Sequence, residues 1–150
     1  MATDEQFMRE ALRLAREGAE AGEVPVGAVV VIEDEIAGGA WNAPISRNDP
    51  TAHAEILAIR EAAAKAGNYR LTGATLYCTL EPCVMCAGAL VAARIGRLVF
   101  AVRDLRFGGV RSKFQLADSD ILNHQMEVVE GVLATESVEL LRGFFAGRRG

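Results

Sequence analysis

Two short runs of this sequence carry three side chains that could bind a metal ion. His53 opens a His-Ala-Glu run, and Cys83 and Cys86 belong to a Pro-Cys-Val-Met-Cys run further along the chain. Imidazole nitrogen and thiolate sulfur are common zinc ligands, and a catalytic zinc ion keeps three protein ligands and leaves its fourth position for water. The residue types and their spacing therefore predict a catalytic zinc site held by His53, Cys83 and Cys86.

Glu55 is a carboxylate beside this predicted site. Residues two apart on a regular helix lie roughly 200° apart around its axis, so Glu55 and His53 are not expected to bind the same ion. A free carboxylate next to zinc can take a proton from zinc-bound water, whose pKa the metal lowers from about 15.7 to about 7. We expect Glu55 to act as this proton shuttle.

The residues around His53 predict that it lies early in a helix. Asp49 and Pro50 are typical of an N-cap followed by proline at the first helical position. The helix is expected over residues 50–66, with Gly67 as its stop.

The cysteines are also expected at a helix start. Pro82 predicts the beginning of a helix over residues 83–94, and Cys83 and Cys86 share one face of it because they are three residues apart. Free amides in a first helical turn favour the thiolate form that binds zinc. The third cysteine, Cys78, lies in an apolar run and is expected to be a buried small hydrophobic residue.

Hydrophobic periodicity in the rest of the chain predicts helices and strands that alternate. A helix is expected over 4–21 and another over 136–149, with strands at 26–32, 36–41, 74–80, 97–102 and 126–132. Loops are expected at 42–50 and 103–125, the second with one helical turn near 116–122. Strands separated by helices pair in parallel, so we expect a three-layer α/β/α fold, a central five-stranded mixed sheet, and a single domain over residues 1–150.

Composition and charge limit the classes of function. The formal net charge is −4, which argues against a protein that coats nucleic acid non-specifically, yet six basic residues and one acid fall within 94–113. A local basic patch suits a small, shaped RNA, although ordinary surface arginines give the same pattern. Three cysteines make no disulfide framework, and no long apolar run or targeting segment is visible. We therefore expect a cytoplasmic protein that does not bind membranes.

The combination of His-Ala-Glu with Pro-Cys-x-x-Cys is the signature of zinc-dependent nucleobase deaminases. Beyond the signature, the sequence resembles the bacterial tRNA-specific adenosine deaminases of the cytidine and deoxycytidylate deaminase superfamily along nearly its whole length. The matching segments are 23–29, 41–42, 49–55, 68–71 and 79–89. This resemblance implies a cytidine-deaminase-like fold.

The resemblance also implies an activity. Relatives hydrolytically deaminate the wobble adenosine of a tRNA anticodon, that of arginine tRNA, to inosine. Hydroxide activated by one zinc ion per subunit would attack C6 of adenine while Glu55 moves the protons. The adenine must be unstacked, which an anticodon loop permits more easily than a duplex, so the expected partner is a tRNA anticodon stem-loop and not DNA. Relatives are homodimers, so a homodimer is expected.

Further site residues follow from the resemblance. Those implied to contact the substrate are Asn42, Val26, Pro44, Ala54, Leu80, Pro82 and Asp104. Those expected to contact the RNA are Arg70, Arg103, Arg106, Asn123, His124 and Phe145. Ordinary structural roles stay open for these residues: Asp104 could pair with a neighbouring arginine, and Phe145 has the spacing of a core residue on the last helix.

One segment departs from the family pattern. After Arg103 and Asp104, relatives commonly continue with lysine, a small residue, Gly-Ala and Gly-Ser, whereas residues 105–114 of this chain read Leu-Arg-Phe-Gly-Gly-Val-Arg-Ser-Lys-Phe. The difference concerns the RNA-contacting loop and not the zinc chemistry. The resemblance therefore does not determine which RNA is recognised.

Two other functions are compatible with the zinc motif. A deaminase of a free base or nucleoside, such as guanine, cytosine or adenine, would share the motif and lack only the basic features expected to contact RNA. A zinc-stabilised RNA-binding module without catalysis would need neither Glu55 nor an open fourth position on the metal, so the sequence favours an enzyme.

Overall fold

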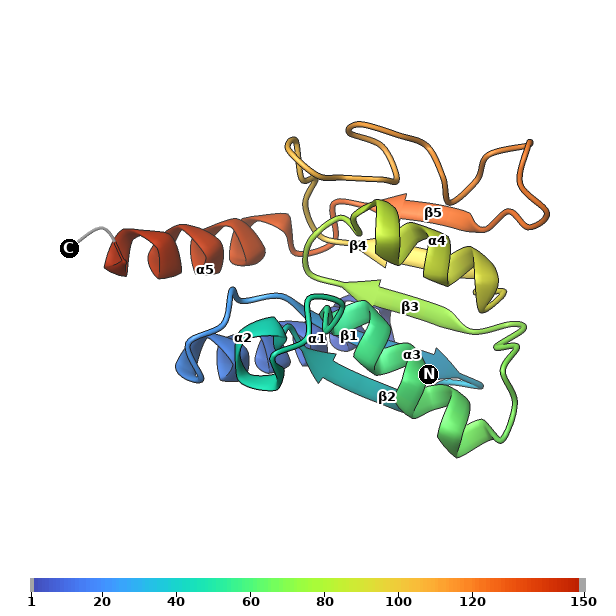
Figure 1. Cartoon of the computed structure of the whole chain (residues 1–150), viewed down its shortest axis with the longest axis horizontal. Helices are drawn as coiled ribbons and strands as arrows, with labels where there is room; N and C mark the ends of the chain where they lie inside the picture. Colours follow the sequence, from blue (N-terminus) through green and yellow to red (C-terminus); the bar gives the residue numbers. More distant parts are fainter. Residues whose placement is uncertain (1, 149–150) are drawn as a thin grey trace.

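Five strands form one mixed sheet at the centre of the structure, a computed structural model that describes residues 2–148 (Figure 1). The strands are β1 (Gly27–Ile32), β2 (Glu35–Trp41), β3 (Thr75–Cys78), β4 (Arg97–Phe100) and β5 (Glu127–Glu130). Their order in the sheet is β2-β1-β3-β4-β5. β1 is antiparallel to both of its neighbours, whereas β3, β4 and β5 are parallel. The predicted mixed sheet is confirmed.

Helices cover both faces of this sheet. α1 (Asp4–Glu20) lies on one face, and α3 (Ala54–Ala66) and α4 (Val84–Ala92) lie on the other (Figure 1). Successive side chains of a strand point to opposite faces. Along β1, Val30 joins the cluster under α3 and α4, while Val29 joins the cluster under α1. The three-layer prediction is therefore confirmed.

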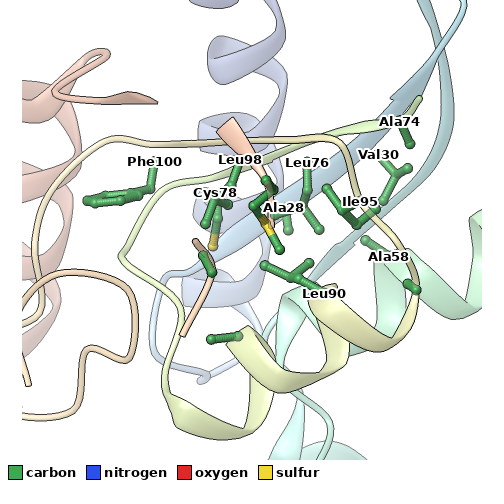
Figure 2. Close-up of a cluster of buried hydrophobic side chains, with 14 of the residues drawn as sticks. Ala28, Val30, Ala58, Ala74, Leu76, Cys78, Leu90, Ile95, Leu98 and Phe100 are labelled. Carbon is green, nitrogen blue, oxygen red and sulfur yellow. The ribbon is translucent and has the colours of Figure 1, made fainter. Parts of the chain in front are cut away.

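The larger hydrophobic cluster lies between the sheet and the two helices that lead to the zinc ligands. Figure 2 shows strand residues such as Leu76 and Leu98 facing Leu90 of α4 and Ala58 of α3, all of them buried. Small residues bring α3 close to β2: a side chain at Gly38 would collide with the backbone carbonyl of Ala58. This packing fixes where α3 and α4 begin, and hence where the ligands lie.

The boundary of α3 differs from the prediction. The helix begins at Ala54 and not at residue 50, and His53 is its N-cap with extended backbone angles. Asp49 does not cap the helix, because its carboxylate accepts hydrogen bonds from the amide (2.9 Å) and hydroxyl (2.7 Å) of Thr51 and forms a local turn instead. The expectation that His53 lies inside a regular helix is therefore wrong.

Two other differences lie close to the zinc ligands. α4 runs from Val84 to Ala92, so Cys83, expected as the first helical residue, is instead the N-cap, while Pro82 lies ahead of the helix as predicted. Residues expected to be a loop form the short helix α2 (Pro44–Arg47).

The C-terminal third of the chain also departs from expectation. The segment before β5 contains turns but no helix where a helical turn was expected near 116–122. α5 (Ala134–Gly147) extends beyond the end of the sheet (Figure 1). Ser137 is its one buried residue within the part that the structure describes, and Phe145 is 47% exposed. The placement of Phe145 in the core is therefore wrong. The last residue of the helix expected over 136–149 lies outside the described residues.

Candidate active site

The three predicted ligands meet where two helices begin. The Nδ1 atom of His53 lies 3.5 Å from the Sγ atom of Cys83 and 3.4 Å from that of Cys86. All three ligand atoms lie within 4.8 Å of one another. Tetrahedral zinc, with bonds of about 2.0–2.3 Å, separates a nitrogen and a sulfur ligand by roughly 3.5 Å. The residues present fit a zinc ion without rearrangement.

The environment of Cys83 favours the form that binds metal. A hydrogen bond from the Cys86 thiol, followed by one from His53, lowers the pKa of Cys83 to about 4. Zinc binds thiolate and not thiol, so metal binding displaces the remaining protons of the cluster. The set of two sulfur ligands and one nitrogen ligand leaves one tetrahedral position for a reactant, which is the arrangement of catalytic zinc sites.

Glu55 lies beside the ligands in the first turn of α3. Its side chain is 4% exposed and faces the same hollow as His53 and Cys83. Burial raises the pKa of Glu55 above its ordinary value. Because His53 is an N-cap and not an interior helical residue, the two side chains face one hollow in spite of their spacing. The structure therefore brings together the carboxylate and the three ligands that the sequence singles out.

A cavity of about 480 Å³ opens above these groups. It is lined by four of the seven residues expected to contact the substrate, namely Val26, Asn42, Leu80 and Asp104. Of the other three, Ala54 and Pro82 are buried, and Pro44 begins α2 two residues after Asn42 without lining the cavity. Val24, Glu81 and Phe107 complete the lining and were not anticipated from the sequence.

Glu23, also not anticipated, anchors one wall of the cavity. Its carboxylate is 1% exposed and accepts hydrogen bonds from the backbone amides of Ile45 (3.3 Å) and Ser46 (2.7 Å) in α2. Burial alone would raise the pKa of Glu23, but the hydrogen bonds from Ser46 and Ile45 hold it below its ordinary value. Glu23 thus holds the segment that carries Asn42 and Pro44.

Glu81 anchors the opposite wall. Its carboxylate, 2% exposed, accepts hydrogen bonds from four backbone amides of one loop and from a serine hydroxyl. The donors are the amides of Asp104 (3.1 Å), Val110 (3.0 Å), Arg111 (2.7 Å) and Ser112 (3.0 Å), and the hydroxyl of Ser112. A carboxylate two residues before a zinc ligand therefore organises the whole 104–112 loop. An acidic residue inside the apolar run that leads to Pro82 was the one signal for it in the sequence.

Two glycines let the 104–112 loop pack against the start of α4. A side chain at Gly108 would collide with the Glu81 carboxylate, and one at Gly109 would lie 2.9 Å from the backbone of Val84. The amide of Gly109 donates a hydrogen bond to the carbonyl of Pro82 at 2.8 Å. This loop and the cysteine segment consequently form one rigid unit.

The residues expected to contact RNA fall into two groups. Arg103, Arg106 and Phe145 lie near the cavity: Arg103 pairs with Glu130 at 2.9 Å, while Arg106 and Phe145 line a second hollow of about 720 Å³ beside α5. Arg70, Asn123 and His124 lie at the other end of the sheet. The Nε2 atom of His124 is 2.6 Å from the carbonyl oxygen of Ile95, just before β4 begins. Within one chain these two groups do not meet.

Comparison with known proteins also indicates a zinc-dependent deaminase. A family model described as the cytidine and deoxycytidylate deaminase zinc-binding region matches residues 1–102. The tRNA-specific adenosine deaminase of Haemophilus influenzae is 50% identical over 147 residues, which cover 97% of this chain and 85% of that protein.

Solved structures are similar as well. One, from a study of A-to-I editing by deaminases at the wobble position of transfer RNA, superposes with a TM-score of 0.88 at 43% identity and covers 91% of this chain and 99% of that one. A guanine deaminase from Nitrosomonas europaea superposes with a TM-score of 0.85 at 27% identity, covering 97% and 86%. With its zinc-ligand geometry, this chain belongs to the zinc-dependent cytidine and deoxycytidylate deaminase family and, within it, to the tRNA-specific adenosine deaminases.

Proposed function

We propose that this protein removes the C6 amino group of the wobble adenosine in a tRNA anticodon by hydrolysis, giving inosine and ammonia. One observation carries the proposal: His53, Cys83 and the buried carboxylate of Glu55 line a single cavity, with Cys86 buried within 4.8 Å of the other two ligand atoms, in a chain half identical to a tRNA-specific adenosine deaminase. Arginine tRNA, named by the resemblance, is the first substrate to test.

His53, Cys83 and Cys86 would hold the zinc ion, which would supply the Lewis-acid chemistry that makes water reactive at neutral pH. Glu55 acts as the proton shuttle of the reaction. It accepts one proton from the attacking water and delivers it to the ring nitrogen beside C6. It then takes the second proton of that water, from the hydroxyl now on C6, and passes it to the amino group, which leaves as ammonia while C6 becomes a carbonyl. Its burial supports this role, because little bulk water reaches the carboxylate to compete for protons.

The walls of the cavity position the adenosine. Val26 and Leu80 offer apolar surface to the two faces of the base, and the amide of Asn42 offers a donor and an acceptor to the nucleoside. Asp104 stands at the rim as an acceptor for the RNA. Ala54, Pro82 and Pro44 do not line the cavity, and their expected role is to support the residues that do. A cavity of about 480 Å³ suits one unstacked nucleoside and excludes a base-paired one.

The test is inosine formation by the zinc-loaded protein on an anticodon stem-loop with adenosine at the wobble position, alongside free adenosine, guanine and cytidine. We expect conversion of the stem-loop alone. The second candidate is deamination of a free base, which the similarity to the guanine deaminase favours. Turnover confined to guanine or another free base would reject the RNA substrate and leave the assignment of zinc and Glu55 in place.

We also propose a homodimer. Arg70, Asn123 and His124 are expected to contact RNA yet lie far from their own cavity, so a second copy can bring them to it. Val84 and Met85 on α4 are 46% and 36% exposed and supply apolar surface for such an interface. Sedimentation analysis checks the proposal, and a monomer at micromolar concentration would contradict it.

Residues 1–150 would act as one catalytic domain, since α3 and α4, whose first turns carry the metal ligands and Glu55, pack against one sheet. We place the enzyme in the cytoplasm, because tRNA is its substrate and reduced cysteines are its ligands. No helix among residues 2–148 is long and apolar enough to cross a membrane.

A further inference from the structure

Phe107 lies at the rim of the active-site cavity, in the loop that departs from the family pattern. Its side chain is 61% exposed and lines the cavity together with Asp104. A large aromatic side chain that is left open to solvent adds little to the stability of the chain that carries it. An exposed ring at the mouth of a nucleobase site instead offers a surface on which a second base can stack.

Positive charge lies on one side of this ring. The guanidinium carbon of Arg106 lies 5.3 Å from the centre of the Phe107 ring, within cation–π range. Arg106 also lines the neighbouring hollow with Arg142 and Arg148 of the α5 region. Residues 106 and 107 therefore form a ridge between the active-site cavity and a basic hollow. An RNA strand that places one nucleotide in the cavity would next meet the aromatic face of Phe107 and then three arginines. This positive charge suits the phosphates of a polyanion.

The ridge is held in place before any ligand binds. The Asp104 carboxylate accepts hydrogen bonds from the amides of Arg106 (3.1 Å) and Phe107 (3.2 Å), so the turn that presents the ring is fixed. The Glu81 carboxylate accepts hydrogen bonds from the amides of Asp104 and Ser112, at the two ends of the loop. The absence of a side chain at Gly108 lets the loop pack directly against this carboxylate. A ring on a preorganised loop loses little conformational freedom when a base stacks on it.

We propose that Phe107 is a stacking platform for the nucleobase next to the target adenosine, and that it thereby helps determine the RNA that this enzyme accepts. The proposal rests on the proposed function, because it requires an RNA strand with its adenosine in the cavity. Arg106 contributes charge beside the stacked base, and Glu81 acts as a positioning residue for the platform. A free base or nucleoside has no neighbouring base and gains nothing from Phe107.

The experiment compares Phe107→Ala with the unchanged protein on two anticodon stem-loops: one with normal flanking bases and one with an abasic site on each side of the target adenosine. On the normal stem-loop we expect Phe107→Ala to raise KM about 5- to 160-fold, the range that loss of one stacked base produces, with kcat nearly unchanged. On the abasic stem-loop the two proteins are expected to agree within about twofold. Phe107→Trp should restore binding, whereas Phe107→Leu should not.

Phe114→Ala is the matched control, because Phe114 is 57% exposed in the same segment but lines neither hollow. It should leave KM unchanged on both stem-loops. Equal KM values for Phe107→Ala and the unchanged protein on the normal stem-loop would overturn the proposal. An equal loss on the abasic stem-loop would also overturn it, because the ring would then be contacting something other than a flanking base.

A binding measurement separates this inference from the proposed function. 2-Aminopurine beside the target adenosine should lose fluorescence on binding to the unchanged protein and keep it with Phe107→Ala, since stacking quenches this base. If the stem-loop is deaminated but quenching is the same for both proteins, the inference alone fails. If the unchanged protein neither binds nor deaminates the stem-loop, the proposed function itself fails.

Discussion

Replacing Glu81 tests whether the buried carboxylate holds the wall of the cavity. Its Oε2 atom accepts the amides of Val110, Arg111 and Ser112, and its Oε1 atom accepts the amide of Asp104 and the hydroxyl of Ser112. Hydrogen bonds to a charged group contribute about 1.5–3 kcal/mol each. Water that enters the vacated space replaces part of the lost hydrogen bonding. We therefore expect Glu81→Ala to lower the free energy of unfolding by about 3–5 kcal/mol.

Glu81→Gln provides a graded comparison. The amide oxygen can keep the three bonds made by Oε2, but the amide nitrogen then faces the N–H group of Asp104, and the charge is lost. One unsatisfied amide costs about 1–3 kcal/mol, so this variant should lie between the unchanged protein and Glu81→Ala. Activity should fall in the same order, because Asp104 and Phe107 depend on the loop for their positions.

Three measurements decide the outcome. Urea denaturation gives the loss of stability, hydrogen exchange of the amides of residues 110–112 reports the loop itself, and metal analysis ensures that all variants compared carry zinc. We expect faster exchange in both variants, and fastest in Glu81→Ala. If the Glu81→Ala midpoint and the exchange of these amides both match the unchanged protein, the carboxylate does not hold the loop, and the reasoning is refuted.

Three further predictions concern the shuttle, the metal and an ion pair remote from the site. Glu55→Ala should keep zinc and fold but lose about a thousandfold in deamination rate, read as inosine formed per zinc-loaded site; unchanged turnover would mean that another group moves the proton. Removing zinc with a chelator should lower the melting temperature, because the ligands then lose their shared partner; Cys86→Ser should give a protein that added zinc no longer restores. Asp4→Asn should cost about 1–2 kcal/mol at pH 7, since the Asp4 carboxylate accepts two hydrogen bonds from Arg97 and one from Tyr77. The hydrogen bonds from Arg97 are the main reason that the pKa of Asp4 lies below 3.8 in the folded protein. The stabilisation that the Asp4 carboxylate provides is therefore present above pH 3.8 and is lost as the pH falls through the folded-state pKa. The stability difference between the two proteins, followed by denaturation from pH 6 to acid, should therefore shrink, and a constant difference would contradict this linkage.

The type of zinc chemistry could be predicted from residue types alone. His53, Cys83 and Cys86 were predicted as ligands because of their own atoms, and the spacing of the two cysteines allows both to approach one ion. The order of strands and helices was also readable, because apolar periodicity is a local property. The helix boundaries were harder to predict. Asp49 has the residue type of an N-cap, but its carboxylate forms a turn with Thr51.

The last helix illustrates a different limit. Val138, Leu141 and Phe145 have the spacing of a buried face, and the sequence places them toward a core. In the structure α5 extends past the sheet, and Phe145 is exposed beside a hollow lined by arginines. Periodicity indicates that a helix has an apolar side. It does not indicate whether the rest of the chain reaches that side.

The sequence by itself predicted the metal, its candidate ligands, the neighbouring carboxylate and the type of sheet, because each prediction depends on side-chain chemistry or on short-range pattern. Only the tertiary structure revealed that Glu23 and Glu81 hold the two walls of the cavity and that Phe107 stands at its rim. The hydrogen-bond partners of both glutamates lie more than twenty residues away. A buried carboxylate is stabilised by whichever amides the fold brings to it, and that is decided only when distant segments pack together.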